Sequence, residues 1–436
     1  MVINKNKLLN IHNYYVLTSC FYILLYIFIT PPFYVADEYA HFQKATSKEN
    51  IVFRGVLTVD KGIKNFADDY EILAYKKWNV DRSSKYNKNF ITSDINKYNL
   101  TNEYTRANLA SLATYPVTGY LIPKITSFFT QIFTDKVLII FYAGRVGNFI
   151  FCMIACWLTL KTISSGKEYL FLLLSMPMTL TLFGSFNQDA ALFSYTLFIL
   201  FFSSKLNSHN KFTELNLFFI QLFCFLLIIG RPTYLPFGLL PLFFIKKFSY
   251  HKLTQFIFFF IFSILVFYIL SSAETPLPSN PLFPSFNLFK LLSIIFNDLI
   301  VHLPKYIGLM IGGLGRIDLI VNLNIIVIFL LFIVYFFLKN INYKFIFTHF
   351  NLLLFLIFTS SFILTQLIQY IYFSPSGETS FIKGVQGRYF IPIFILLAMF
   401  QNKNSILNNK PINRTIIYII PHLNIFVIYQ YYSFFY

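Results

Sequence analysis

The chain has 436 residues, of which 56% are hydrophobic and only 12% are charged, and its formal net charge is +17. In soluble globular domains about a quarter of the residues are charged, so this composition excludes an ordinary soluble enzyme. The basic residues are scattered between apolar runs and form no stripe, which excludes a nucleic-acid-binding protein.

The apolar residues are grouped in runs of roughly 17–25 residues, the length of a helix that crosses a bilayer. We therefore predict an all-α polytopic membrane protein, with a single integral membrane domain over residues 1–436 and about 11 transmembrane helices. The first run, at about residues 14–30, follows Lys5 and Lys7. It is long for a signal peptide and lacks small residues at its end, so we expect an uncleaved first span with a cytoplasmic N-terminus.

Residues 31–112 are the only long polar segment, and they hold ten of the eighteen acidic residues. A segment of this length translocates largely regardless of its basic residues, so we place it outside as a long first extracytoplasmic loop. We expect short helices and loops there, without strands. The chain then divides into an N-terminal span (1–30), an outer loop with juxtamembrane helices (31–133) and the remaining transmembrane helices (134–436).

Two later segments are ambiguous. Residues 111–133 are apolar but broken by Pro116, Gly119 and Pro123, and we expect them to lie along or dip into the outer interface, with a full crossing as the alternative. Residues 288–317 are amphipathic and are expected outside as interfacial or re-entrant structure. With this choice nearly every short basic loop falls inside, as the positive-inside rule requires. The later spans are expected at 137–160, 168–184, 190–204, 214–230, 233–246, 254–270, 319–338, 347–372, 388–401 and 415–433.

The stretch that follows the first span carries the strongest chemical signal. Pro31 and Pro32 stop a helix, because proline removes a donor and clashes with the preceding turn. Asp37, Glu38 and His41 follow within five residues of one another. If a helix begins near Asp37, residues three and four apart share one face. We interpret this stretch as the edge of an active site, where a spanning helix leaves the bilayer.

Transfer of a sugar from a polyprenyl-phosphate carrier fits carboxylates that meet guanidinium groups at the outer face. A carboxylate can take the proton of the acceptor hydroxyl as a general base. A bidentate arginine can stabilise the charge that grows on the leaving phosphate, and Arg231 and Arg388 are the best candidates. A divalent metal, Mg or Mn, held by Asp37, His41 or Asp189 suits the ligand types, but the spacing does not require one. The cofactor therefore stays unknown.

The stretch from Pro32 through Asp37-Glu38 to His41-Phe42 resembles the opening signature of a bacterial family of predicted membrane proteins, domain of unknown function 2142. Ala36 and Tyr39 stand where prolines are usual, and a Gln is inserted in the later Asn-Asp element. The resemblance covers roughly residues 20–400. The other matching elements, in chain order, are Tyr115-Pro116, Arg145 to Asn148, Asn187-Gln188-Asp189, Arg231-Pro232-Thr233-Tyr234 and Gln386-Gly387-Arg388-Tyr389-Phe390-Ile391-Pro392.

That family looks like a relative of the GT-C glycosyltransferases, membrane enzymes that use lipid-phosphate sugars and carry a catalytic acid in the first outer loop. The resemblance implies a GT-C-like fold in a bacterial inner membrane, with Asp37 as the catalytic acid and Glu38 as its neighbour or substitute. It also implies an inverting transfer to an extracytoplasmic glycan, lipid or protein acceptor. The residues assigned to substrate binding are His41, Tyr115, Arg145, Asp189, Arg231, Gln386, Arg388 and Tyr389.

Two other classes of function stay open. A flippase or transporter of lipid-linked sugars would also be polytopic and basic, but transporters are commonly built from internal repeats, and we find none. A polymerase of lipid-linked polysaccharide is closer in chemistry, and it would be expected to carry its key residues in a late loop, near Arg388.

Overall fold

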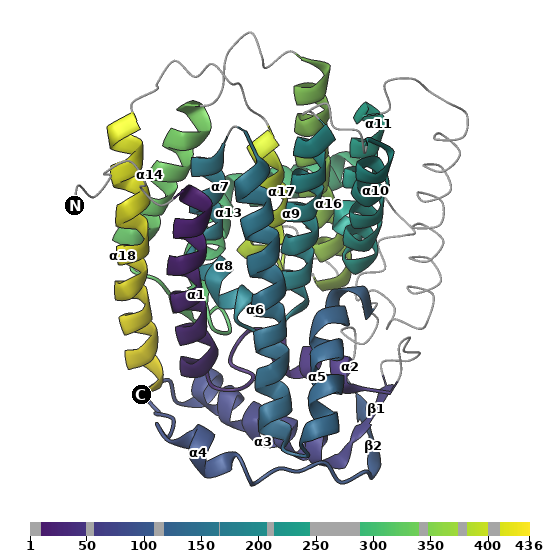
Figure 1. Ribbon diagram of the computed structural model, residues 1–436, viewed down its shortest axis with the longest axis vertical. Helices are drawn as coiled ribbons and strands as arrows, with labels where there is room; N and C mark the ends of the chain where they lie inside the picture. Colours follow the sequence, from purple (N-terminus) through teal and green to yellow (C-terminus); the bar gives the residue numbers. More distant parts are fainter. Residues whose placement is uncertain are drawn as a thin grey trace, which may run out of the picture.

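The structure, a computed structural model, describes residues 10–48, 56–108, 117–164, 166–206, 213–244, 288–339, 348–373, 382–399 and 410–436. Figure 1 shows an elongated helical bundle with a smaller polar part at one end. Helix α1 runs toward this polar part, and the C-terminal helix ends beside it. We call residues 31–48 and 56–108 the polar cap.

Most of the bundle helices coincide with the apolar runs of the sequence. Five described helical segments are long and apolar enough to cross a membrane, and shorter apolar helices accompany them. The five are Ile11–Ile29, Val137–Thr162, Gln188–Leu206, Leu292–Gly312 and His349–Ile371. This confirms a polytopic, predominantly helical membrane protein. The corresponding helices are α1 (Ile11–Ile29), α6 (Val137–Thr162), α9 (Gln188–Leu206), α13 (Leu288–Gly312) and α16 (His349–Phe373), joined by α10 (Thr213–Gly230), α14 (Leu323–Lys339) and α18 (Lys410–Phe435).

Three predicted spans are not single α-helices. Each carries a proline, which cannot donate to the helical ladder and clashes with the preceding turn. The segment 168–184 divides at Pro177, and 233–246 starts as a 3₁₀ helix with Pro236 inside, whereas Pro392 lies in the first turn of α17. The resulting elements are α7 (Lys167–Leu174) with α8 (Pro177–Phe183), η4 (Pro232–Leu239) with α11 (Leu240–Phe244), and η5 (Gly387–Phe390) with α17 (Ile391–Leu396) and η6 (Leu397–Met399).

The two ambiguous segments differ from each other. Residues 117–133 form η3 (Val117–Tyr120) and α5 (Leu121–Phe133), which packs along α6 (Figure 1). A helix of 13 residues is about 20 Å long, too short for a bilayer core of about 30 Å. By contrast, α13 is one continuous helix, and Leu292–Gly312 is long and apolar enough to cross. The expectation of interfacial or re-entrant structure at 288–317 stays a prediction. The expected span 254–270 lies outside the described residues.

The polar cap contains strands that we did not expect. Strand β1 (Val56–Asp60) pairs antiparallel with β2 (Tyr104–Asn108), with Val56 opposite Asn108. Leu57 and Val59 alternate onto one buried face, as a half-buried strand does. The partner strand lies more than forty residues along the chain, so the local pattern gave no sign of the pairing. The helices of the cap are α2 (Glu38–Thr46), α3 (Lys61–Tyr75), the π-helix η1 (Lys76–Val80) and α4 (Phe90–Asp94).

A cluster of phenylalanines joins the cap to the bundle. The ring of Phe33 lies 5.3 Å from that of Phe66 and 5.1 Å from that of Phe141. Phe42 on α2 contacts Phe186, with ring centroids 5.2 Å apart. All five side chains are fully buried. Because aromatic pairs contribute about 0.5–1.5 kcal/mol each beyond their area, this cluster fixes the cap on the bundle.

We expect Gly144→Ala to destabilise the protein, because a Cβ there would lie 1.9 Å from a ring carbon of Phe186. Such overpacking costs about 1–3 kcal/mol. The matched control is Gly308→Ala, where a Cβ meets nothing within 4 Å and alanine favours the helix by about 1 kcal/mol. Thermal unfolding in detergent checks both variants, and equal midpoints for the two would contradict this packing.

Candidate functional site

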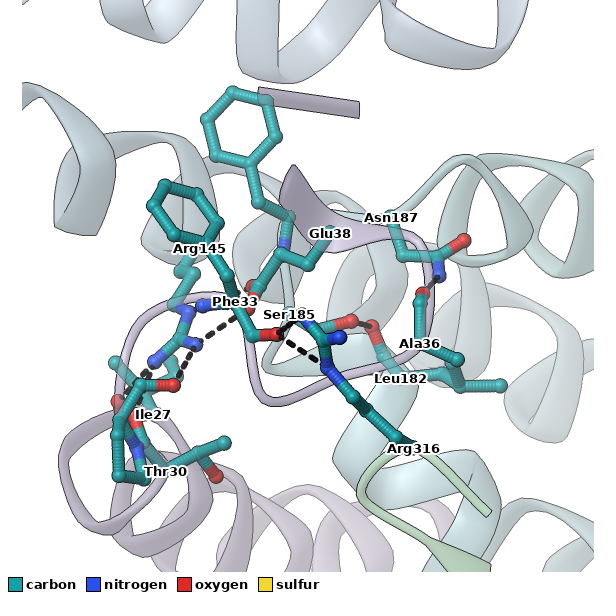
Figure 2. A network of polar contacts seen from close by, with 12 residues as sticks. Ile27, Thr30, Phe33, Ala36, Glu38, Arg145, Leu182, Ser185, Asn187 and Arg316 are labelled. Atoms are coloured by element: carbon teal, nitrogen blue, oxygen red, sulfur yellow. Dashed lines mark hydrogen bonds and ion pairs between the residues drawn. The ribbon is translucent and has the colours of Figure 1, made fainter. Parts of the chain in front are cut away.

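One arginine on α6 bonds to the backbone where α1 ends and the loop to α2 begins. Helix α1 ends before Pro31, as the prolines predict. The guanidinium of Arg145, on α6, then donates to the carbonyl oxygens of Ile27 and Thr30 at 2.8 Å and to that of Pro31 at 3.2 Å (Figure 2). The carbonyls of Ile27 and Thr30 are among the unpaired acceptors that a helix C-terminus leaves, whereas that of Pro31 lies beyond the helix and also accepts from the Tyr34 amide. Arg145 therefore caps the end of α1.

The other side of the loop is held by two further elements. Strands β3 (Gly313–Leu314) and β4 (Leu319–Ile320) form a short hairpin, and Arg316 in its turn donates to the Phe33 carbonyl at 3.0 Å. The Gly315 carbonyl accepts from the Ala36 amide at 3.2 Å. From the residue before α9, the Asn187 amide donates to the Ala36 carbonyl at 3.1 Å (Figure 2). Segments far apart in sequence thus fix the loop backbone.

Glu38 forms a closed ion pair with Arg145. Its two carboxylate oxygens accept from Nε and Nη2 of Arg145 at 2.9 and 2.7 Å, and both side chains are fully buried. The same oxygens accept from the backbone amides of Phe33 at 3.1 Å and Phe186 at 2.7 Å. Four donors satisfy this carboxylate, which is the condition for a stable buried charge. The pair ties the cap, α6 and the α8–α9 connection together.

Asp37 lies apart from this pair. Its backbone is left-handed, with φ 65°, a conformation that aspartate tolerates better than most residues. Its Oδ2 lies 2.6 Å from Nη2 of Arg388, and its side chain is 35% exposed, whereas that of Arg388 is 2% exposed. Burial raises the pKa of the Asp37 carboxyl, but the Arg388 guanidinium and other nearby cations more than offset it, so this pKa lies below its ordinary value.

Asp189 links the Asp37–Arg388 pair to Arg231, so that negative and positive side chains alternate. Its Oδ2 lies 3.1 Å from Nε of Arg388, and its Oδ1 lies 2.9 Å from Nη1 of Arg231. The Arg231 guanidinium lies over the Tyr389 ring, 4.2 Å from its centroid. The Tyr389 carbonyl accepts from the Tyr234 hydroxyl at 2.8 Å. We call Asp37, Arg388, Asp189 and Arg231 the ionic cluster. Its formal charge is zero, and Asp37 is its partly exposed end.

His41 lies on the first turns of α2 and is fully buried. Its Nδ1 lies 2.7 Å from the hydroxyl of Tyr120, at the end of η3. Burial lowers the pKa of His41 to about 4, although the charges of the ionic cluster also act on it. The imidazole is therefore neutral at neutral pH. Sequence reasoning did not identify Tyr120, because nothing in the local pattern showed that η3 returns to α2.

The structure brings together most of the residues that the sequence selected. Asp37, Asp189, Arg231 and Arg388 form one cluster, and Tyr389 stacks on it. Glu38 and Arg145 form a separate closed pair, so the two adjacent acids have different surroundings. The half-buried Gln386 precedes η5, and its Oε1 has no hydrogen-bond partner within the described residues. Tyr115 lies outside the described residues.

A divalent metal does not fit the donor set. One guanidinium, that of Arg388, bonds the carboxylates of both Asp37 and Asp189, and it carries the positive charge that a metal would supply there. The third candidate, His41, shares its Nδ1 with Tyr120. In the part of the chain that the structure describes, no group of three or more His, Cys, Asp or Glu side chains is arranged to hold a metal ion.

The fold and the site define a multi-pass helical membrane protein with a largely buried ionic cluster that joins Asp37 of the polar cap to residues of the bundle. The chain belongs to the DUF2142 family of predicted membrane proteins, whose family model matches residues 20–397. This confirms the resemblance seen in the sequence motifs. No curated protein and no solved structure matches the chain.

Glu38→Gln should strongly destabilise the protein, because it leaves the buried Arg145 charge without a counter-charge. Removing one partner of a buried ion pair costs about 3–5 kcal/mol. The control is Glu103→Gln, in an exposed pair with Lys61, which should change the unfolding midpoint little. Thermal melts in detergent compare the two, and a small loss for Glu38→Gln would show that this pair does not hold the loop.

The buried His41 predicts a pH dependence of stability. Its pKa is about 4 in the folded protein against an ordinary value of 6.5. Between these values only the unfolded state binds the proton, so the free energy of unfolding should fall as the pH falls from 6.5 toward 4. The lowered pKa of Asp37 acts only below 3.8, outside this window.

His41→Gln should flatten this dependence, since glutamine does not titrate. The full effect of the shift is about 3 kcal/mol. Thermal midpoints from about pH 7.5 to about pH 4.5 measure it for both proteins. Identical pH profiles for the two would show that His41 is not protected from protonation.

Proposed function

We propose that this protein is an inverting membrane glycosyltransferase that moves a sugar from a polyprenyl-phosphate donor to a glycan, lipid or protein acceptor. The observation that supports it best is the Asp37 carboxylate. It is partly exposed, it is held ionised by a buried guanidinium, and its loop is fixed by three separate elements. A general base needs a free lone pair and a fixed position. In the described part of the chain only Oδ2 of Asp37 is bonded.

The role proposed for each side chain of the ionic cluster follows from its charge. Asp37 takes the proton of the acceptor hydroxyl while the acceptor oxygen bonds to the anomeric carbon. The bond from that carbon to the phosphate oxygen breaks, and the electron pair leaves with the lipid phosphate. Arg388 still has N–H groups directed elsewhere than at Asp37 and Asp189, and with Arg231 it is the proposed partner of the growing phosphate charge.

Glu38 and Arg145 are assigned a positioning role in this proposal, because all four bonds of the Glu38 carboxylate are used within the protein. His41 and Tyr120 contribute a neutral hydrogen-bonded pair beside the cluster. The proposal places the polar cap on the extracytoplasmic face of a bacterial cell membrane, where lipid-linked sugar donors and glycan acceptors meet. The charges of the cluster gather near one end of the bundle, which favours a transferase over a transport path through it.

Asp37→Asn should reduce transfer by about 10²–10⁴-fold, since the amide cannot accept the proton. The matched control is Asp68→Asn, another partly exposed carboxylate of the polar cap, paired with Lys64. Cells that rely on each variant are compared for surface glycan composition and, by mass spectrometry of extracted lipids, for unused polyprenyl-phosphoryl sugars.

The expected outcome is loss of a glycan component and accumulation of a lipid-linked sugar in the Asp37→Asn cells alone, with equal membrane levels of both proteins. Normal glycan and no accumulation would refute the assignment of Asp37. A sugar lipid that stays on the cytoplasmic leaflet would instead favour a flippase.

A further inference from the structure

Several buried side-chain oxygens on the elements that carry the ionic cluster, or on the element packed against them, have no hydrogen-bond partner. In the part of the chain that the structure describes, these include Oε1 of Gln188 and Gln386 and Oγ1 of Thr118 and Thr233. Buried polar groups in proteins are bonded in the large majority of cases, because an unpaired one costs about 1–3 kcal/mol. The presence of four unpaired oxygens on elements around one ionic cluster therefore needs an explanation.

Gln188 is the clearest case. It is the first residue of α9, immediately before Asp189, and it is 2% exposed. The adjacent Asn187 uses both ends of its amide, since it donates to the Ala36 carbonyl and accepts from the Asp189 amide at 2.8 Å. Asn187, whose amide is bonded at both ends, and Gln188, whose Oε1 is unpaired, are therefore consecutive residues.

A glycine brings η3 close to this glutamine. A Cβ on Gly119 would lie 2.9 Å from Cβ and 3.2 Å from Oε1 of Gln188. Gly119 therefore permits Gln188 to lie against η3, between Thr118 and Tyr120. The Thr118 carbonyl accepts from the Tyr195 hydroxyl at 2.6 Å, so η3 is anchored to α9. The unpaired oxygens of Thr118 and Gln188 therefore belong to two elements that pack together.

The other two oxygens belong to residues that are close in sequence to the arginines of the cluster. Gln386 comes two residues before Arg388, and Thr233 comes two residues after Arg231 on η4. The Tyr234 hydroxyl ties η4 to the backbone of Tyr389. Unpaired oxygens thus occur within two residues in sequence of Asp189, Arg231 and Arg388, and on η3, which packs against α9.

The chemistry of these atoms restricts the ligand. Amide oxygens accept hydrogen bonds, and hydroxyl groups both accept and donate. A phosphate diester has no proton to donate, so it cannot satisfy the two amide oxygens. A group rich in hydroxyls can satisfy all four atoms, since each hydroxyl donates one bond and accepts others. The guanidinium groups can bind the phosphate of a ligand, and the unpaired oxygens can bind the hydroxyl-rich group attached to that phosphate.

We propose that Gln188 and Gln386, with Thr118 and Thr233, form a subsite that binds the hydroxyl groups of a sugar beside the ionic cluster. The identification of that sugar as one carried on lipid phosphate rests on the function proposed above. Gln188 is the specificity-determining residue of this subsite, because its side chain is more deeply buried than that of Gln386.

The test measures binding by the purified full-length protein in lipid nanodiscs. The probes are polyprenyl phosphate alone and polyprenyl phosphate carrying glucose, galactose, mannose or arabinose. We expect at least one sugar-bearing lipid to bind about tenfold or more tightly than the bare lipid phosphate. Gln188→Leu should abolish most of that preference and leave the affinity for bare polyprenyl phosphate unchanged. Gly119→Ala, which displaces the Gln188 side chain, should weaken the preference in the same way.

The matched control is Gln221→Leu, a buried glutamine on α10 that lies about 15 Å of helix before Arg231. It should leave the sugar preference intact. The unfolding midpoint of the ligand-free protein gives a second readout, because the unpaired Oε1 of Gln188 is a cost to stability that leucine removes. Gln188→Leu should keep or raise that midpoint.

Three results would overturn the subsite. One is a wild-type protein that prefers no sugar-bearing lipid over the bare phosphate. Another is a preference that survives in the Gln188→Leu, Gln386→Leu double variant. The third is a midpoint that drops by several degrees in Gln188→Leu. A sugar preference that depends on Gln188 together with normal glycan in Asp37→Asn cells would support the subsite and refute the transferase, so the two failures are distinguishable.

Discussion

The guanidinium of Arg145 is fully buried, and such a charge is stable only with a counter-charge and acceptors for its protons. Glu38 supplies the charge, and the carbonyls at the end of α1 supply the acceptors. Those carbonyls are free because the prolines end α1 there. The buried pair therefore depends on the end of the helix, and the path of the loop depends on both. The position of Asp37, the next residue, depends on all three.

The ionic cluster has a different character. Its two carboxylates and two guanidinium groups alternate, so the cluster is neutral as a whole although each member is charged. Alternation lets three nearly buried groups share one another's charges, and it leaves a single partly exposed carboxylate at the end. The pair of Glu38 and Arg145 is fully buried, whereas the Asp37 side chain is partly exposed. Adjacent acids in the sequence thus serve opposite needs.

The sequence predicted the polytopic helical architecture, because long apolar runs are a direct consequence of bilayer thickness. The count of about 11 spans stays a prediction. The sequence also selected Asp37, Asp189, Arg231 and Arg388, since charged residues in apolar surroundings are costly and therefore informative. It could not tell Glu38 from Asp37, because their difference is set by Arg145 and Arg388, which lie 107 and 351 residues further along the chain. Tyr120 and the β1–β2 pairing were missed for the same reason: both depend on contacts between segments that have no local signature.

The long separation between Asp37 and Arg388 has a consequence for biogenesis. Glu38 can meet Arg145 once α6 has left the ribosome, so the loop can be fixed while most of the bundle is still to be made. Arg388 is synthesised 351 residues after Asp37, and until then the Asp37 carboxylate has no guanidinium from η5 to pair with. A truncated or stalled chain would therefore hold the scaffold of the site without its charge partner.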